Sequence, residues 1–494
     1  MIFGFNIILQ PVNLLYCFLG VLMGTLVGVL PGLGPAAAIS LLLPVTFYTP
    51  AVASFIMLAG ICYGAAYGGS TTSILVNIPG EASSVVTCLD GYQMAKQGRA
   101  GPALGIAAFG SFIAGTAGVF GLMLFAPPLA NYAVRFGPPE FFSLAVMSLT
   151  LVTYVSKGSV VRSLMMACTG IIMGTVGMDP FTSRARFTFG FGGLSDGFDL
   201  VSVAMGLFGM SEVLDNLGQS LKSETLDTRV KNLLPDRKDW KHSAMPIARG
   251  TAIGFFLGII PGFGSVITSF VSYAIEKKFS KHPEKFGTGV IEGVAGPESA
   301  NNAAYSGAFI PLLSLGIPVM PSAAILMGAL MIQGIQPGPL LISSRPDLFW
   351  GVIASMYIGN VMLLVLNLPL IRLWVQILKI PYSFLYVLVV LFCQIGAYSV
   401  NSSVTDVVVM NIIGLFGYLM RRYQFEGAPL ILAIILGPML EISLRRALMI
   451  SDGSPAVFLL RPLSAVFLLI SVVFLIYPLF AKERLGKKAI EAKD

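Results

Sequence analysis

Two short patches of uncharged polar residues in this apolar chain have side chains that can bind an organic anion. They occupy residues 68–80 (GGSTTSILVNIPG) and 296–306 (GPESANNAAYS). A lone Ser or Thr often only bonds a carbonyl of its own helix, but four in a row after Gly-Gly exceed that need. Hydroxyls, amides and helix ends bind a carboxylate without a buried arginine. The predicted substrate contacts are Ser70, Thr71, Thr72, Asn77, Pro79, Gly80, Ser299, Asn301, Asn302, Tyr305 and Pro318.

A glycine-rich phrase occurs twice and suggests a cation site. Residues 20–34 read GVLMGTLVGVLPGLG, and residues 250–264 read GTAIGFFLGIIPGFG. The glycines spaced four apart predict a smooth face for close helix packing. The terminal Pro-Gly-x-Gly breaks a helix and exposes backbone groups, which can hold a coupling cation or an anion, although a simple kink also fits. The predicted cation-binding residues are Pro31, Gly32, Gly34, Pro261, Gly262 and Gly264.

The composition places the chain in a membrane. Of its 494 residues, 55% are hydrophobic and 11% are charged, whereas soluble proteins carry about 25% charged residues. The first charged residue is Glu81. The net charge of +7 lies in short loops, as expected of a multi-pass protein, and does not indicate nucleic-acid binding. The five scattered cysteines are interpreted as small buried hydrophobes.

The predicted fold is an all-α polytopic membrane protein with about 11–13 membrane segments. Regions 12–80 and 247–345 are apolar but interrupted, so we expect them to form half-helices or re-entrant hairpins covered by protein. For 247–275 a re-entrant hairpin and one kinked span both fit. Uninterrupted spans are predicted at 103–126, 141–156, 160–178, 199–217, 348–372, 382–400, 404–420, 428–444 and 463–481.

Matching phrases divide the chain into two halves. We predict one structural repeat over 1–217 and a second over 250–445, joined by a basic linker at 218–249. Residues 446–494 add a last helix and a basic tail. The positive-inside rule places the linker and the tail in the cytoplasm, so half one starts outside and half two inside. The two structural repeats are therefore predicted to be inverted.

Four acidic residues lie nearest the polar patches, namely Glu81, Asp90, Glu292 and Glu298. A buried carboxylate in a membrane is a functional candidate, but for Glu81 and Asp90 we favour a position in an aqueous vestibule. Enzyme signatures are missing from the sequence. It has no HExxH and no GxxxxGK[ST], and both histidines lie in charged loops. The chain is therefore predicted not to be an enzyme and to need no cofactor.

Three long phrases carry a resemblance to a known family. They are GVLPGLGPAAAISLLLPVTF (28–47), YGGSTTSILVNIPGEASSVVTCLDGYQMAKQGRAGPAL (67–104) and GTGVIEGVAGPESANNAAYSGAFIPLLSLGIPVMPSAAILMGAL (287–330). With them, nearly the whole chain resembles the large membrane subunit of the tripartite tricarboxylate transporters, the TctA-type family. The resemblance implies a bacterial inner-membrane secondary transporter with two partners, a small four-span membrane subunit and a periplasmic solute-binding protein.

The resemblance also implies uptake of citrate-like or other organic carboxylates, driven by a gradient of Na+ or H+. A membrane channel or a membrane-embedded enzyme is the alternative. A channel needs a polar stripe along several helices, but the polar residues here concentrate in two patches. An enzyme needs a nucleophile with a base, and no such pair is apparent in the sequence.

Overall fold

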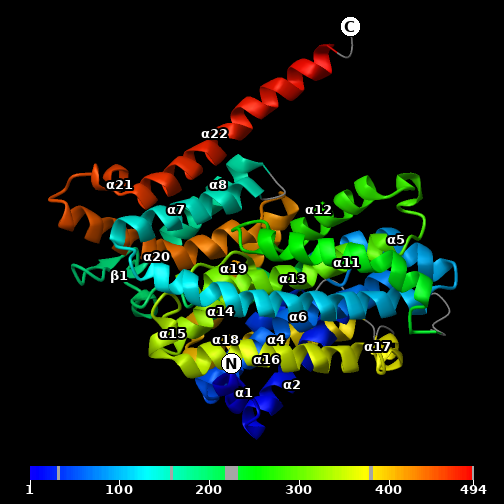
Figure 1. Cartoon of the computed structure of the whole chain (residues 1–494). Coiled ribbons are helices and arrows are strands. Elements are labelled where there is room, and N and C mark those ends of the chain that lie inside the picture. Colours follow the sequence, from blue (N-terminus) through cyan, green and yellow to red (C-terminus); the bar gives the residue numbers. More distant parts are fainter. Residues whose placement is uncertain (31–33, 156–158, 217–231, 378–381, 492–494) are drawn as a thin grey trace.

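The chain folds almost entirely into helices, which Figure 1 shows lying roughly along one common direction. The computed structural model describes residues 1–30, 34–155, 159–216, 232–377 and 382–491. Within these ranges the one sheet is a two-residue antiparallel pair, β1 (Gly177–Met178) and β2 (Ala185–Arg186). The all-α prediction is therefore confirmed.

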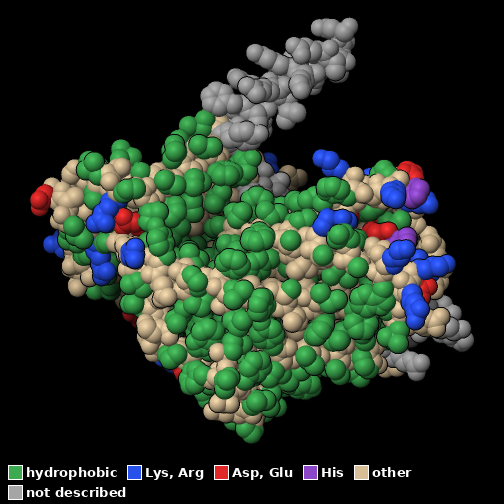
Figure 2. Space-filling view, in the orientation of Figure 1, with side chains coloured by type: hydrophobic (Ala, Val, Ile, Leu, Met, Phe, Trp, Pro, Cys, Tyr) green, Lys and Arg blue, Asp and Glu red, His purple; other side chains and the backbone are tan. Residues whose placement is uncertain are grey.

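Six of the described helices are long and apolar enough to cross a membrane. They are α2 (Pro11–Val29), α4 (Ala51–Val76), α6 (Ala100–Ala133), α16 (Pro346–Asn367), α19 (Val404–Arg422) and α20 (Gly427–Ile450). Hydrophobic side chains cover the middle of the face in Figure 2, and Lys and Arg gather at its two ends. This distribution fits a multi-pass membrane protein, because a bilayer excludes charge from its centre.

Shorter elements connect and flank these helices. Each predicted uninterrupted span corresponds to a helix, except that 199–217 comprises three consecutive helical elements. Two of the helices extend well beyond the predicted ends, to residue 133 instead of 126 and to residue 491 instead of 481. The remaining helices are α1 (Ile2–Ile8), α3 (Pro35–Leu42), α5 (Val85–Lys96), α7 (Pro138–Val155), α8 (Val160–Gly174), α9 (Leu200–Ala204), α10 (Ser211–Asn216), α11 (Arg237–Gly258), α12 (Gly264–Phe279), α13 (Glu292–Leu315), α14 (Pro321–Ile332), α15 (Leu341–Ser344), α17 (Ile371–Ile377), α18 (Tyr382–Asn401), α21 (Val457–Leu460) and α22 (Pro462–Glu491), with short turns η1 (Leu43–Tyr48), η2 (Ala82–Ser84), η3 (Gly192–Leu194), η4 (Met205–Met210) and η5 (Pro283–Lys285).

Both glycine rows pack a helix tightly against a partner, as predicted. A Cβ on Gly20 or Gly28 would lie 2.3 Å from a backbone oxygen of α4, and one on Gly254 would lie 2.1 Å from the Ala300 oxygen of α13. Side chains larger than hydrogen therefore do not fit, as at other close helix contacts in membranes. In each pair, a glycine later in the first helix contacts a residue later in the second helix. Therefore α2 runs parallel to α4, and α11 runs parallel to α13.

The helices α4 and α13 cross the centre of the molecule in opposite directions. Phe55, near the start of α4, packs against Phe309, near the end of α13, with ring centroids 6.4 Å apart. Ser70, near the end of α4, bonds Glu298, near the start of α13. The two glycine-packed pairs therefore run antiparallel to each other.

The stretch 247–275 belongs to a helical hairpin, which settles one of the open alternatives. After Gly258 the chain turns at Gly262, whose φ is +89°, and α12 returns along α11. Arg249 on α11 forms a salt bridge with Glu276 near the end of α12. Since these two residues are almost equally distant from the turn, a single kinked span is excluded.

One expectation about broken helices is wrong. Residues 70–73 and 299–302 lie inside the continuous helices α4 and α13, not at breaks. Both helices instead end at a residue whose backbone adopts the left-handed conformation, Asn77 with φ +57° and Gly316 with φ +69°. Ser, Thr and Asn are compatible with a helix interior when neighbouring helices supply their hydrogen-bond partners.

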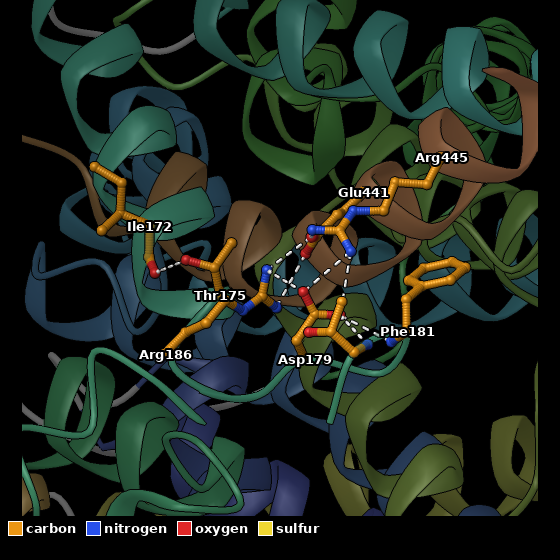
Figure 3. Close-up of polar contacts among 8 residues, drawn as sticks. Ile172, Thr175, Asp179, Phe181, Arg186, Glu441 and Arg445 are labelled. Carbon is orange, nitrogen blue, oxygen red and sulfur yellow. Dashed lines mark hydrogen bonds and ion pairs between the residues drawn. The ribbon is translucent and has the colours of Figure 1, made fainter. Parts of the chain in front are cut away.

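A charged cluster, which we call the rim clasp, ties the β1–β2 hairpin to α20 (Figure 3). It consists of Asp179, Arg186, Glu441 and Arg445. Arg186 and Arg445 each approach Glu441 to 2.7 Å, and Arg445 approaches Asp179 to 3.0 Å. Hydrogen bonds from the backbone N–H groups of Phe181 and Thr182, and the Arg445 guanidinium, lower the pKa of Asp179 to about 2.

Candidate functional site

A cavity of about 400 Å³ opens where turns from both halves of the chain meet. Its wall includes Gly34 from the first Pro-Gly phrase and residues 262–264 from the second. It also includes residues 81–83 and 319–322. Cavities of roughly 300–1,000 Å³ typically hold small-molecule ligands.

Several helices begin at this cavity. Gly34 precedes α3, Phe263 precedes α12 and Met320 precedes α14, and none of these three N-cap side chains bonds the first turn. Pro35 and Pro321 occupy the first helical position, where their fixed φ suits a helix start. The N-terminal ends therefore direct partial positive charge toward the cavity, which favours an anion.

Glu81 lies at the cavity wall and is only 6% exposed. Asn301 Nδ2 donates to its Oε1 at 3.0 Å, and the Tyr305 hydroxyl donates to its Oε2 at 3.2 Å. The Ser83 hydroxyl also donates to Oε1. Gly80 lets the preceding turn press onto α2, since a Cβ there would lie 2.1 Å from the Gly28 oxygen.

Glu298 is a second buried carboxylate, on α13 one turn before Asn301 and Asn302. It is 1% exposed. The Ser70 hydroxyl donates to its Oε2 at 2.5 Å, and the Thr87 hydroxyl donates to Oε1. We call Glu81 and Glu298 the core carboxylates. Among the described residues neither forms an ion pair with a lysine or an arginine.

The predicted substrate contacts are divided between the core carboxylates and other positions. Ser70, Asn301 and Tyr305 hydrogen-bond the core carboxylates. Of the whole predicted set, Tyr305 alone appears in the cavity lining. Two of the others bond elsewhere: the Thr72 hydroxyl donates to the Val29 oxygen, and Asn302 donates to the Ser111 hydroxyl. Thr71 borders a small void, and Ser299 is buried without a hydrogen-bond partner among the described residues. Gly80 and Pro318 are buried, Pro79 is half-buried, and Asn77 is exposed.

Some of the predicted cation-binding residues line the cavity and others do not. Gly34, Gly262 and Gly264 line the cavity, and Pro261 is buried beside them in the chain. The N–H of Gly262 donates to the Val319 oxygen at 3.1 Å, which joins the second Pro-Gly turn to the start of α14. Pro31 and Gly32 lie outside the described residues.

The vestibule interpretation of Asp90 is wrong, and for Glu81 it needs correction. Asp90 is fully buried, and its Oδ1 accepts N–H groups from Gly287, Gly289 and Val290 at 2.8–3.0 Å. It therefore fixes the loop before α13. Glu81 borders a cavity but is itself buried. A sequence signal was available, because Glu81 ends a run of 80 uncharged residues.

Comparison with protein families decides the relationship. The family model described as "Tripartite tricarboxylate transporter TctA family" matches residues 14–432. The chain belongs to the TctA family. Membership makes it a component of a tripartite transporter with other subunits and argues against an enzyme.

Two relatives of this TctA protein come from Agrobacterium vitis. One, "Uncharacterized 52.8 kDa protein in TAR-I ttuC' 3'region", is 52% identical over 481 residues, covering 97% of this chain and 96% of the relative. The other, "Uncharacterized protein in TAR-II ttuC' 3'region", is 50% identical over 241 residues, covering 49% of this chain and all of the relative. No solved structure matches the chain significantly.

Proposed function

We propose that this TctA protein imports tricarboxylates or related organic carboxylates across the bacterial inner membrane, driven by a Na+ or H+ gradient. The observation that carries the proposal is the cavity at which turns from both halves and three uncapped helix starts converge. Each helix N-terminus contributes roughly 0.3–1 kcal/mol toward an anion. Together they replace the arginine that a soluble carboxylate site commonly uses.

The two halves are proposed to form an inverted repeat. The antiparallel crossing of α4 and α13 supports this proposal, because each half then presents its own glycine-packed pair in the opposite sense. Inverted repeats place substrate sites at their interface, near the middle of the bilayer. Reporter fusions should place Met1 and Lys238 on opposite sides of the membrane, and fusions on the same side would contradict the inversion.

The substrate is proposed to arrive from a periplasmic solute-binding protein, and a small four-span membrane subunit is the proposed membrane partner. Family membership supports both partners. Candidates are the proteins encoded beside this chain's gene. The test therefore uses all three proteins together.

The first experiment measures uptake of radiolabelled citrate, with malate and succinate as competitors, in cells that produce the complete transporter. Ala36→Phe fills the cavity wall without removing a polar group, and Ala185→Phe makes the same change on the exposed strand β2. We expect a loss of about 10–100-fold for Ala36→Phe and less than about a twofold change for the control. Unchanged uptake by an Ala36→Phe protein present at normal levels would reject this cavity as the site.

Cation-gradient dependence separates a transporter from the alternatives. A channel gives no accumulation against a gradient, and an enzyme converts the labelled substrate to a product. Proteoliposomes that contain the complete transporter should concentrate citrate only when a Na+ or H+ gradient is imposed.

A further inference from the structure

The core carboxylates lack a positive partner. Glu81 and Glu298 are 6% and 1% exposed, and every hydrogen bond found for their carboxylate oxygens comes from a neutral hydroxyl or amide. Removing an ionised carboxylate from water is costly unless another charge compensates for it. In a membrane protein such a group marks an ion or proton pathway by default.

A vacant acceptor atom beside Glu81 points to a missing ligand. Asn301 Oδ1 is buried and, among the described residues, has no hydrogen-bond partner. Asn301 donates its Nδ2 to Glu81, so its vacant oxygen belongs to the same amide that touches the carboxylate. Buried polar atoms are rarely left unpaired in native proteins. Oxygen atoms of carboxylate, amide and hydroxyl groups are also the ligands that hard cations prefer.

No described basic group near the core carboxylates can neutralise them. The titratable neighbours of Glu81 are Glu298, Tyr305 and Cys62, and Glu426 lines the same cavity. Those of Glu298 are Glu81, Tyr67 and Cys88. All of these groups are neutral or negative when they titrate, so no basic side chain among the described residues supplies a full compensating charge.

We propose that Glu81 binds one monovalent cation, Na+ or a proton, at the cavity wall, with Glu298 and Asn301 as its supporting groups. This inference rests on the proposed transport function and names its coupling site. Glu81 shares the cavity with the helix starts that attract the substrate. An ionised Glu81 repels a carboxylate there, whereas a neutralised Glu81 admits it. The cation therefore binds first, and substrate and cation move together.

The test separates cation binding from substrate transport. The purified complex is heated with Na+ or with K+ at pH 8, and then without Na+ between pH 8 and pH 5.5. A sodium site raises Tm with Na+ but not with K+, whereas a proton site raises Tm as the pH falls and ignores Na+. Glu81→Gln and Glu298→Gln should each remove the shift. Glu292→Gln should keep the Na+-dependent shift at pH 8, because Glu292 lies on the same helix but pairs with His242 near the surface.

Transport supplies a second readout. In proteoliposomes Glu81→Gln should lose about tenfold or more of gradient-driven citrate accumulation. A Glu81→Gln protein whose accumulation still follows the cation gradient would overturn the proposal, as would a wild-type Tm that neither Na+ nor protons change. A wild-type protein that shows the cation shift but moves none of the carboxylates would overturn the substrate class and leave the cation site supported.

Discussion

The rim clasp and the core carboxylates each contain two acidic side chains, but only the rim clasp contains arginines. At the rim, Arg186 and Arg445 lie 2.7–3.7 Å from the carboxylates of Asp179 and Glu441. In the core, the hydrogen-bond donors that Glu81 and Glu298 find among the described residues are all uncharged. In the rim clasp, arginines of the chain itself neutralise the carboxylates that hold the β1–β2 hairpin on α20. The core carboxylates have no arginine partner among the described residues.

Solvent explains why the two arrangements have different consequences. The arginines of the rim clasp are 24% and 36% exposed, so water screens their ion pairs and each pair contributes little to stability. The core carboxylates are only 6% and 1% exposed, so water screens them much less and an absent counter-charge matters far more. The rim clasp therefore serves positioning, and the core carboxylates are suited to binding an exchangeable ion.

Of the substitutions considered, one that adds a positive charge beside Glu81 should change citrate accumulation the most. Asn301→Lys places an ammonium group beside Glu81, where it substitutes permanently for the cation. We expect accumulation to fall by at least about 100-fold and the cation-dependent Tm shift to disappear. The assay is gradient-driven citrate uptake together with Tm at several Na+ concentrations and pH values.

A double variant provides the control for that substitution. With Glu81→Gln added to Asn301→Lys, the ammonium loses its partner, and the protein should become less stable than either single variant. Additive effects of the two substitutions on Tm would show that the two side chains do not interact.

Removing one arginine from the rim clasp should lower Tm and citrate uptake, but by less than the substitution at Asn301 does. Arg445→Ala leaves Arg186 to serve both Asp179 and Glu441. We expect Tm to fall by about 2–4 °C and citrate uptake to fall by no more than about fivefold, because solvent reaches the site. Arg445→Lys is the matched control and should recover most of the loss. A complete loss of uptake at normal protein levels would place the clasp in the transport machinery.

The effect of pH on the stability that the rim clasp contributes should be smaller than the effect of removing Arg445. The folded pKa of Asp179 is about 2, below the unfolded value of about 3.9. Its contribution to stability is therefore complete above pH 4 and is lost as the pH falls through about 2. Between pH 5 and pH 8, plots of Tm against pH for wild type and Asp179→Asn should run parallel. Profiles that diverge in this range would contradict the lowered pKa.

The smallest effect is expected at Asn77, which the sequence suggested as a substrate contact. The structure places it exposed at the C-terminal end of α4 with φ +57°. Glycine adopts this conformation without strain, so Asn77→Gly should change the KM for citrate by less than about twofold. A KM raised tenfold or more in uptake assays would return Asn77 to the binding site.

Much of the architecture follows from local sequence pattern. The apolar runs predicted the long helices, and the glycines spaced four apart predicted the close helix contacts made by Gly28 and Gly254. Both signals are local, because hydropathy and small side chains act over one or two helical turns. The phrases that carry the family resemblance are also contiguous, and the family comparison bears them out.

The candidate site was predicted less completely. The structure brings three of the predicted contacts to the core carboxylates, since Ser70, Asn301 and Tyr305 bond them, and their role in substrate binding stays a prediction. The two regions that hold these residues were expected to form half-helices or re-entrant hairpins, because polar and helix-breaking residues interrupt their apolar runs. Partners from distant helices satisfy these side chains instead, and no local pattern encodes that.

The sequence by itself determined that the chain is helical and membrane-embedded, which segments carry a glycine face for close packing, and to which family it belongs. Only the tertiary structure decided that Glu81 is buried against Asn301, 220 residues away, and that Gly34 and the second Pro-Gly turn border one cavity. Burial and the charge around a group depend on every element that packs against it. For Glu81 those elements come from both ends of the sequence, so its environment exists only once the helices have assembled.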